Sequence, residues 1–578
     1  MCGILFTNIN IKNLEYVINY LKYRGPDFTN QKIINNYNFI HCLLSMTGEF
    51  RPQPFIKDDI ICLFNGEIYN YDEFGNYNTD GECLIPLYEK YGTDFVKKLD
   101  GEFALILVDF KNDLLIFSTD IFSIKPLWLS IENDKIGISS YESCLRRLNF
   151  SNPKQLEPNK THIYKLSKLE KIEEKIVYKF CLKQYKNNYS DWITAFEKSI
   201  YKRTRNIKHG LFIGLSAGYD SGAIACELLK QKNDFSAYTI LGSEDENIIK
   251  SRCKDIKKSN IINLSKEQFI ESRDYLHKNS ESYFFKIENG EKENYIRLLL
   301  KIEKNKKELD NNLKHLSYKL KHGSTRKNDN FCILCNNYEC EWKSKGSGAI
   351  RRNLQDFIIG DTKKLNIVLK QLKYRSHGQN VRDDNGSIGM SYICSKAKKK
   401  KQLIYLSGSG ADEIFSDYGF NGIKHFSHST IGGKFPENLE DIFPWKNFYD
   451  NTQKAYLMKE ETVTGSYGIE GRYPFLDKFV VQEFLWLHND LKNKNYKAPL
   501  YNYFRLNNYP FQLELKTGFN CGFTNVLNNY QKKNMNIKYK KIGMNNRKDL
   551  IVNYNEIKLI NSYIKKNNID FEKLINDI

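Results

Sequence analysis

The second residue of the chain is a cysteine, and its position gives it unusual chemistry. Cys2 follows Met1 and precedes Gly3. Methionine is normally removed before a residue as small as cysteine, which would leave Cys2 with both a thiol and a free α-amino group. An α-amine has an ordinary pKa of about 8 and can take the proton of the thiol, so one residue supplies nucleophile and base without a histidine. The alternative interpretation is an ordinary buried cysteine.

Two turns rich in serine and glycine have the composition of anion-binding loops. The first, Leu215–Ser221, follows the apolar run that begins at Gly210 and precedes a helical pattern. The free N–H groups of a helix N-terminus can hold a phosphate. No Gly-Lys-Ser/Thr sequence ends this loop, so it is not a Walker loop. The second turn, Leu406–Phe415, follows the apolar run Leu403–Leu406 in the same way.

Three cysteines in a basic stretch have the spacing of metal ligands. Cys332, Cys335 and Cys340 lie within nine residues, and His322 or His377 is the candidate fourth ligand. Zinc is therefore a candidate cofactor. The alternative is three unligated cysteines in a basic loop.

The elements that must position these residues differ between the two halves of the chain. Residues 1–175 carry short apolar runs separated by Asn, Asp and Gly, which is typical of strands with a few helices. The runs Ile60–Phe64 and Phe103–Val108 are long enough to be strands buried on both faces.

A different pattern begins near residue 185 and continues to about residue 530. Short β runs alternate with helical patterns, which predicts a parallel α/β sheet. Residues 294–380 interrupt this pattern with a charged amphipathic stretch and are interpreted as an insertion, and residues 531–578 as a C-terminal extension. Overall the sequence predicts an α/β protein of two domains.

Four further motifs occur in order in the first 170 residues. They are Arg24–Asp27 (Arg-Gly-Pro-Asp), Phe64–Asn70 (Phe-Asn-Gly-Glu-Ile-Tyr-Asn), Asp100–Ala104 (Asp-Gly-Glu-Phe-Ala) and Lys125–Trp128 (Lys-Pro-Leu-Trp). With Cys2 they resemble the class II, N-terminal-nucleophile glutamine amidotransferase domain of the asparagine synthetase family. The resemblance implies an αββα sandwich that hydrolyses glutamine through a thioester.

The resemblance also implies roles for individual residues. Cys2 is the nucleophile, and the Asn65 side chain and Gly66 backbone N–H stabilise the oxyanion. Glu67 and Asp80 match the positions that hold the glutamine α-ammonium group.

One residue departs from that pattern. The family has an arginine for the glutamine α-carboxylate where this chain has Leu43, and Arg51 is the candidate substitute.

The second half resembles the ATP-pyrophosphatase domain of the same family, whose members split ATP into AMP and pyrophosphate. The two serine-rich turns, Leu215–Ser221 and Leu406–Phe415, match two of its motifs, and Glu470–Asp477 (Glu-Gly-Arg-Tyr-Pro-Phe-Leu-Asp) matches a third. Lys516 matches a lysine that steadies the leaving pyrophosphate. The resemblance implies Mg²⁺ held by Asp220 and Asp412. The implied ATP-binding residues are Leu215, Ser216, Gly218, Asp220, Ser221, Ser407 and Gly408.

The second loop lacks a carboxylate that the family carries. Ser409 stands where the family has Glu or Asp, a group credited with handling the ammonia proton or the substrate amine. Adenylation by Asp220, Asp412 and Lys516 is not expected to depend on it.

Charge and composition narrow the range of partners. The formal net charge is +19, but residues 294–380 hold 19 Lys and Arg against 8 Asp and Glu, so the rest is only mildly basic. Nucleic acid is therefore not expected as a partner. No signal peptide or apolar span is evident, and the 13 cysteines are expected to be reduced, so a cytoplasmic protein is predicted, with a homodimer as a candidate assembly.

The sequence thus predicts a glutamine-hydrolysing ligase that resembles asparagine synthetase. It would adenylate aspartate with ATP and Mg²⁺ and amidate it with ammonia from glutamine, giving asparagine, glutamate, AMP and pyrophosphate. Two alternatives stay open: a related amidotransferase for another carboxylate, and a partly inactive homologue with a binding role.

Overall fold

Two antiparallel sheets form the N-terminal part of the chain in the computed structural model. The structure describes residues 1–242, 245–285, 379–416, 431, 434–512 and 521–523. One sheet has the order β10-β8-β9-β1-β3-β2 and the other β12-β11-β7-β6-β5-β4. The strands are β1 (Gly3–Thr7), β2 (Phe28–Ile34), β3 (Tyr37–Leu43), β4 (Phe55–Lys57), β5 (Ile60–Ile68), β6 (Gly101–Asp109), β7 (Leu114–Thr119), β8 (Trp128–Glu132), β9 (Lys135–Ser139), β10 (Lys154–Gln155), β11 (Lys160–Lys165) and β12 (Glu170–Ile176).

The alternation of side chains along β6 shows how these sheets are layered. Ala104, Ile106 and Val108 pack in a buried cluster with residues of β1 and β3, so the two sheets face each other. Phe103 and Leu105 point the other way and pack against α3 (Leu84–Tyr91). Both faces of β6 are therefore buried, as predicted.

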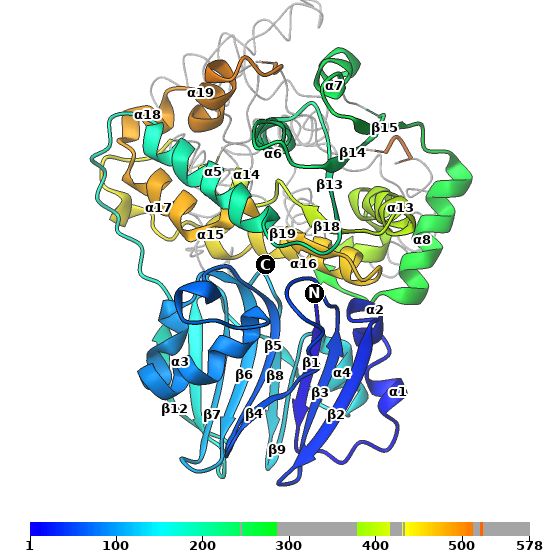
Figure 1. The fold of residues 1–578 in the computed structure, drawn as a ribbon, viewed down its shortest axis with the longest axis vertical. Coiled ribbons are helices and arrows are strands. Elements are labelled where there is room, and N and C mark those ends of the chain that lie inside the picture. The colour runs from blue at the N-terminus through cyan, green and yellow to red at the C-terminus, as the bar shows by residue number, and fades with distance from the viewer. Residues whose placement is uncertain (243–244, 286–378, 417–430, 432–433, 513–520, 524–578) are drawn as a thin grey trace, which may run out of the picture. The chain divides into compact units, whose positions relative to one another are not determined.

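Short helices cover the outer face of the first sheet. α1 (Leu14–Val17), α2 (Leu21–Arg24) and α4 (Glu142–Arg147) contribute to a third cluster that includes Leu5 and Ile40 of that sheet. The order of layers is helix, sheet, sheet, helix, visible in the lower half of Figure 1. The predicted αββα sandwich is confirmed.

The second half is built on a parallel sheet of order β15-β14-β13-β18-β19. All four neighbouring pairs run parallel. Its strands are β13 (Gly210–Gly214), β14 (Phe235–Ile240), β15 (Lys258–Ile262), β18 (Gln402–Leu406) and β19 (Glu470–Arg472). The predicted parallel α/β sheet is confirmed, and β13 and β18, which precede the two serine-rich turns, are neighbours.

Helices surround this sheet (Figure 1). They are α5 (Ser190–Thr204), α6 (Tyr219–Lys230), α7 (Glu246–Cys253), α8 (Lys266–Asn279), α13 (Asn385–Lys399), α14 (Ala411–Phe415), α15 (Lys446–Tyr449), α16 (Thr452–Gly465), α17 (Lys478–Trp486), α18 (Asn489–Asn493) and α19 (Ala498–Leu506). None of the helices in the described ranges is long and apolar enough to cross a membrane.

The chain leaves and rejoins this half at adjacent positions. β16 (Phe284–Phe285) pairs antiparallel with β17 (Gln379–Asn380). Nearly all of the predicted insertion lies between them, at residues 286–378, outside the described residues. An insertion needs ends that lie close together, so this pairing fits the prediction, and the predicted domain boundaries stay a prediction.

Candidate active sites

Cys2 lies directly before β1, beside the end of β3. The Leu44 N–H points at Cys2 Sγ at 3.5 Å, and Sγ lies 3.8 Å from the Leu44 carbonyl oxygen. Arg24 Nε donates to the Cys2 carbonyl at 2.8 Å. Burial raises the pKa of the Cys2 thiol to about 11, although the nearby N-terminal ammonium lowers it. The group is therefore a thiol at neutral pH and needs a base to become a nucleophile.

Asn65 and Gly66 lie together on β5. Both side-chain polar atoms of Asn65 are buried and have no hydrogen-bond partner among the described residues. Unsatisfied buried amides are rare in native proteins and point to a missing partner such as a ligand oxygen. Gly66 has φ +136°, and a Cβ there would lie 2.0 Å from the Glu102 carbonyl oxygen, so only glycine fits.

Glu67 and Asp80 are both buried carboxylates. Burial raises the pKa of Glu67 to about 8, against the lowering effect of Arg472, whose Nη2 lies 3.1 Å from Glu67 Oε1. Burial also raises the pKa of Asp80 to about 6, although the Ile68 N–H donates to its Oδ2 at 2.8 Å. An ammonium group arriving here would favour the charged form of both carboxylates.

The candidates for the glutamine α-carboxylate are less well placed. Leu43 is buried at the end of β3 and carries no charge. The Arg51 side chain is 54% exposed, and its Nε lies 2.8 Å from Glu82 Oε1. Arg51 therefore already has an acidic partner, and its role in binding glutamine stays a prediction.

The first serine-rich turn joins β13 to α6. Ser216 N donates to Ser221 Oγ at 3.0 Å, and Gly218 N donates to Ser216 Oγ at 3.1 Å. Arg252 Nη1 donates to the carbonyls of Ser216 and Gly218 at 2.6 and 2.8 Å. A Cβ on Gly222 would lie 2.6 Å from this guanidinium. Arg252 thus holds the turn through two of its carbonyl groups, a role that no motif in the sequence predicts.

The two turns approach each other closely at the ends of β13 and β18. A Cβ on Gly408 would lie 2.8 Å from Asp220 Cβ. Lys497, just before α19, contacts both predicted magnesium ligands: its Nζ pairs with Asp220 and lies 2.6 Å from Asp412 Oδ1. The structure therefore brings Asp220 and Asp412 together around the Lys497 ammonium group, and a pair of carboxylates this close would also suit a divalent ion. Lys497 itself was not predicted.

Ser409 is not isolated from carboxylates. Its hydroxyl donates to Glu460 Oε1 on α16 at 2.7 Å. This partner was also missed, because Glu460 lies in no motif and is 51 residues further along the chain.

Several predicted site residues fall outside the described residues. They are Lys516 and the candidate zinc ligands Cys332, Cys335, Cys340, His322 and His377. Within the described part of the chain, no group of three or more His, Cys, Asp or Glu residues could hold a metal ion.

Buried ion pairs connect the N-terminal half of the chain to the α16 helix. Arg24 Nη2 lies 2.6 Å from Glu461 Oε2, and Lys125 Nζ lies 3.0 Å from Glu461 Oε1. Lys125 also donates to the Gly471 carbonyl at 2.7 Å. Arg24 and Lys125, which belong to two motifs of the first half, therefore also bind the second half, each through one carboxylate oxygen of Glu461.

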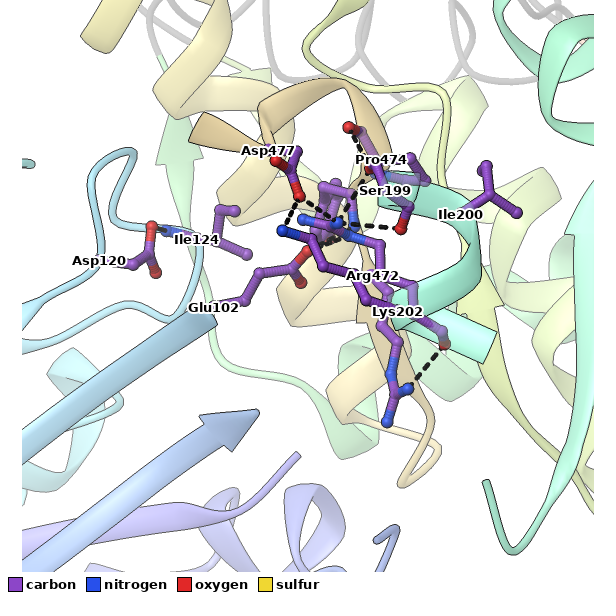
Figure 2. A network of polar contacts seen from close by, with 12 residues as sticks. Glu102, Asp120, Ile124, Ser199, Ile200, Lys202, Arg472, Pro474 and Asp477 are labelled. Carbon is purple, nitrogen blue, oxygen red and sulfur yellow. Dashed lines mark hydrogen bonds and ion pairs between the residues drawn. The ribbon is translucent and has the colours of Figure 1, made fainter. Parts of the chain in front are cut away.

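A second buried network centres on Arg203 of α5. Its Nε donates to Glu102 at 2.8 Å and its Nη1 to Asp477 at 2.8 Å. Glu102 also accepts from the Tyr473 N–H at 2.9 Å. Figure 2 shows Glu102, Asp477 and Ser199 in the same part of this network.

Replacing Arg203 with methionine is expected to lower the free energy of unfolding by about 3–5 kcal/mol. The change leaves Glu102 and Asp477 buried with one partner fewer, and an uncompensated buried charge is costly. Urea unfolding followed by circular dichroism measures the effect. Lys250→Met, which breaks an exposed pair with Glu246, should cost no more than about 1 kcal/mol. Equal losses in both variants would contradict the role given to the buried network.

Comparison with known proteins identifies the first part of the chain. Residues 1–190 match the family model described as a glutamine amidotransferase domain. A protein of Methanocaldococcus jannaschii that carries the name of a glutamine-hydrolysing asparagine synthetase is 27% identical over 47% of this chain and 53% of its own. Asparagine synthetase 1 of Saccharomyces cerevisiae is 30% identical over 38% of this chain and 41% of its own. The chain thus spans about half the length of these relatives. A solved Bacillus subtilis glutamine phosphoribosylpyrophosphate amidotransferase covers 37% of this chain and 60% of its own at 12% identity and a TM-score of 0.26, too weak an alignment to inform the fold.

Proposed function

We propose that this chain, which is related by sequence to the glutamine-hydrolysing asparagine synthetases and begins with a glutamine amidotransferase domain, transfers glutamine nitrogen to an ATP-activated carboxylate, that of aspartate. One observation supports this most directly. The residues predicted for the two reactions lie in two separate clusters, at Cys2 and around Asp220 and Asp412, and buried contacts of Glu461 with Arg24 and Lys125 join the two halves of the chain that carry these clusters.

At the first site, Cys2 attacks the side-chain amide of glutamine. With Met1 removed, the α-amine of Cys2 takes the thiol proton and passes it to the leaving ammonia. The Asn65 amide, which has no hydrogen-bond partner among the residues that the structure describes, and the Gly66 N–H receive the oxyanion, while Glu67 and Asp80 bind the substrate ammonium group. Water then releases glutamate from the thioester.

At the second site, the turn at Ser216–Gly218 receives ATP phosphates at the N-terminus of α6. Asp220 and Asp412 would hold Mg²⁺, which neutralises phosphate charge when bound. The acceptor carboxylate attacks the α-phosphorus, and Lys497 is positioned to stabilise the pyrophosphate that leaves. Lys516 is proposed to act with it.

The acceptor determines which of two related enzymes this is. Relatives named as asparagine synthetases favour aspartate. Ser409, in place of a carboxylate, keeps another carboxylic acid as the second candidate. For either acceptor a cytoplasmic location is proposed, because ATP and glutamine are cytoplasmic substrates.

ATP is expected to be cleaved between its α and β phosphates. Purified protein with glutamine, aspartate, ATP and Mg²⁺ should release AMP and pyrophosphate in a 1:1 ratio, together with asparagine and glutamate. Asp220→Asn should lower this release by about 10²–10³-fold, because it removes one of the two carboxylates that meet at the cation site. Phosphate-resolved chromatography measures both products.

An exposed change provides the control. Asp234→Asn, on the loop before β14, should release AMP at the wild-type rate. Formation of ADP and orthophosphate would overturn the interpretation of the ATP site, and AMP release without asparagine would point to the second acceptor class.

A further inference from the structure

A carboxylate from a distant helix lies against the loop that carries Asp412. Ser409 Oγ donates to Glu460 Oε1 at 2.7 Å, and Ser409 N donates to Ser407 Oγ at 3.0 Å, which orders the loop. The other carboxylate oxygen, Glu460 Oε2, is buried and makes no hydrogen bond with any described residue. Glu460 therefore engages the loop with one oxygen and keeps acceptor capacity on the other.

The charges around Glu460 leave it without a direct ion pair in the described ranges. Lys459 pairs with Asp384 at 2.9 Å, and Glu461 pairs with Arg24 and Lys125. Burial raises the pKa of Glu460, while hydrogen bonds from the Ser407 and Ser409 hydroxyls and the charge of Lys459 lower it. The groups that face it are Ser407 and Ser409, Lys459 and Glu461 on α16, Tyr405 on β18, Cys394 on α13, and Tyr473.

The amide-forming step needs a proton acceptor. Ammonia attacks the carbonyl carbon of the acyl-adenylate with its lone pair, which gives a tetrahedral adduct with a cationic nitrogen. The adduct must lose one proton from nitrogen, and the bond from carbon to the phosphate oxygen of AMP then breaks. Serine alone cannot keep the proton, because a protonated hydroxyl is far too acidic.

We propose that Ser409 and Glu460 form a proton relay for this step, an inference that rests on the proposed function. Ser409 Oγ takes the proton from the adduct nitrogen as its own proton passes to Glu460 Oε1. AMP leaves as its phosphate anion, and Glu460 later releases the proton to solvent. The carboxylate missing at position 409 is thus supplied from α16.

The location of α16 suits this role. The next residue, Glu461, is held by Arg24, and Arg24 Nε also holds the Cys2 carbonyl. The same helix therefore contacts the ammonia-producing site through Glu461 and the Asp412 loop through Glu460. Glu460 therefore contacts the loop of the proposed acceptor site, while Arg24 of the N-terminal half holds the next residue of the same helix.

The test separates activation of the carboxylate from amide formation. With ammonium chloride as nitrogen source and aspartate as acceptor, Glu460→Gln keeps a hydrogen-bond acceptor for Ser409 but cannot take the proton. Its asparagine formation should fall by about 10²–10³-fold. Aspartate-dependent exchange of pyrophosphate into ATP should stay at the wild-type rate. Glu440→Gln, an exposed change, is the matched control and should leave both rates unchanged.

Three further measurements distinguish a relay from a structural role. At fixed free ammonia, the wild-type rate should rise with pH as Glu460 loses its proton, and Glu460→Gln should lose that limb. Adding Ser409→Ala to Glu460→Gln should cause little further loss, because the two residues act as one unit. Ser409→Glu in the Glu460→Gln background should recover part of the rate.

Each outcome is decisive. Wild-type asparagine formation by Glu460→Gln, with normal exchange, overturns the relay and leaves the proposed function intact. Additive losses in the double variant also overturn it. Absence of aspartate-dependent exchange in the wild-type protein overturns the proposed acceptor, and the relay with it.

Discussion

Replacing Cys2 with alanine is expected to reduce glutamine-dependent amide formation by at least about 10³-fold while ammonia-dependent formation stays near the wild-type rate. The thiol is the proposed nucleophile of the first site, and neither Asn65 nor Gly66 could attack the amide in its place. The second site, around Asp220 and Asp412, contains no group from Cys2. Glutamate release and asparagine formation, measured with glutamine or ammonium chloride, give the two rates.

The control uses another cysteine of the same chain. Cys181 is exposed, so Cys181→Ala should change neither rate. Arg24 holds the Cys2 carbonyl and not the thiol, so the alanine variant retains this backbone contact and loses only the contact of Sγ with Leu44. Glutamine use by Cys2→Ala near the wild-type rate would show that Cys2 is not the nucleophile.

The layers of the fold could be predicted because burial leaves recognisable patterns of apolar residues in the sequence. The run Phe103–Val108 is apolar at every position, and the structure buries its alternate side chains in two clusters. Likewise, a strand followed by a serine-rich turn and a helix predicted the parallel sheet, and β13 and β18 lie side by side in it.

The contacts that join the two halves could not be predicted in the same way. Arg24 and Lys125 were recognised as parts of motifs, but their shared partner Glu461 lies more than 300 residues away. Periodicity reports which face of an element is buried and says nothing about which charge a buried arginine will meet. The interpretation of Arg24 as a glutaminase residue was therefore incomplete.

The two acidic loop residues could be predicted from the sequence, but the lysine between them could not. The turns predicted Asp220 and Asp412, because glycine and serine mark the loops. Lys497 precedes Ala498-Pro499 in a segment without such a signature, and only folding places it between the two carboxylates. Ser409 showed that a carboxylate was missing, and the structure was needed to find Glu460.

Lys497→Met should lower aspartate-dependent exchange of pyrophosphate into ATP by about 10²–10³-fold. The lysine is fully buried and contacts both Asp220 and Asp412. In the proposed mechanism its charge therefore lies where pyrophosphate gains negative charge as it leaves. The same variant should bind Mg²⁺ more tightly in the absence of nucleotide, because lysine and metal compete for the same two carboxylates. Exchange assays and calorimetric titration with Mg²⁺ measure these opposite effects.

A slower exchange rate together with tighter Mg²⁺ binding would distinguish a functional role from loss of structure, since a misfolded variant would lose both exchange and Mg²⁺ binding. Lys497→Arg, which keeps the charge, should recover part of the exchange rate. Lys186→Met is the matched control: Lys186 also pairs with two carboxylates, Asp191 and Glu483, but neither belongs to the serine-rich turns. Its exchange rate and Mg²⁺ affinity should be those of the wild-type protein. If Lys497→Met exchanged pyrophosphate at the wild-type rate, the lysine would serve only to neutralise the charges of Asp220 and Asp412, and the stabilisation of pyrophosphate would have to come from elsewhere in the chain.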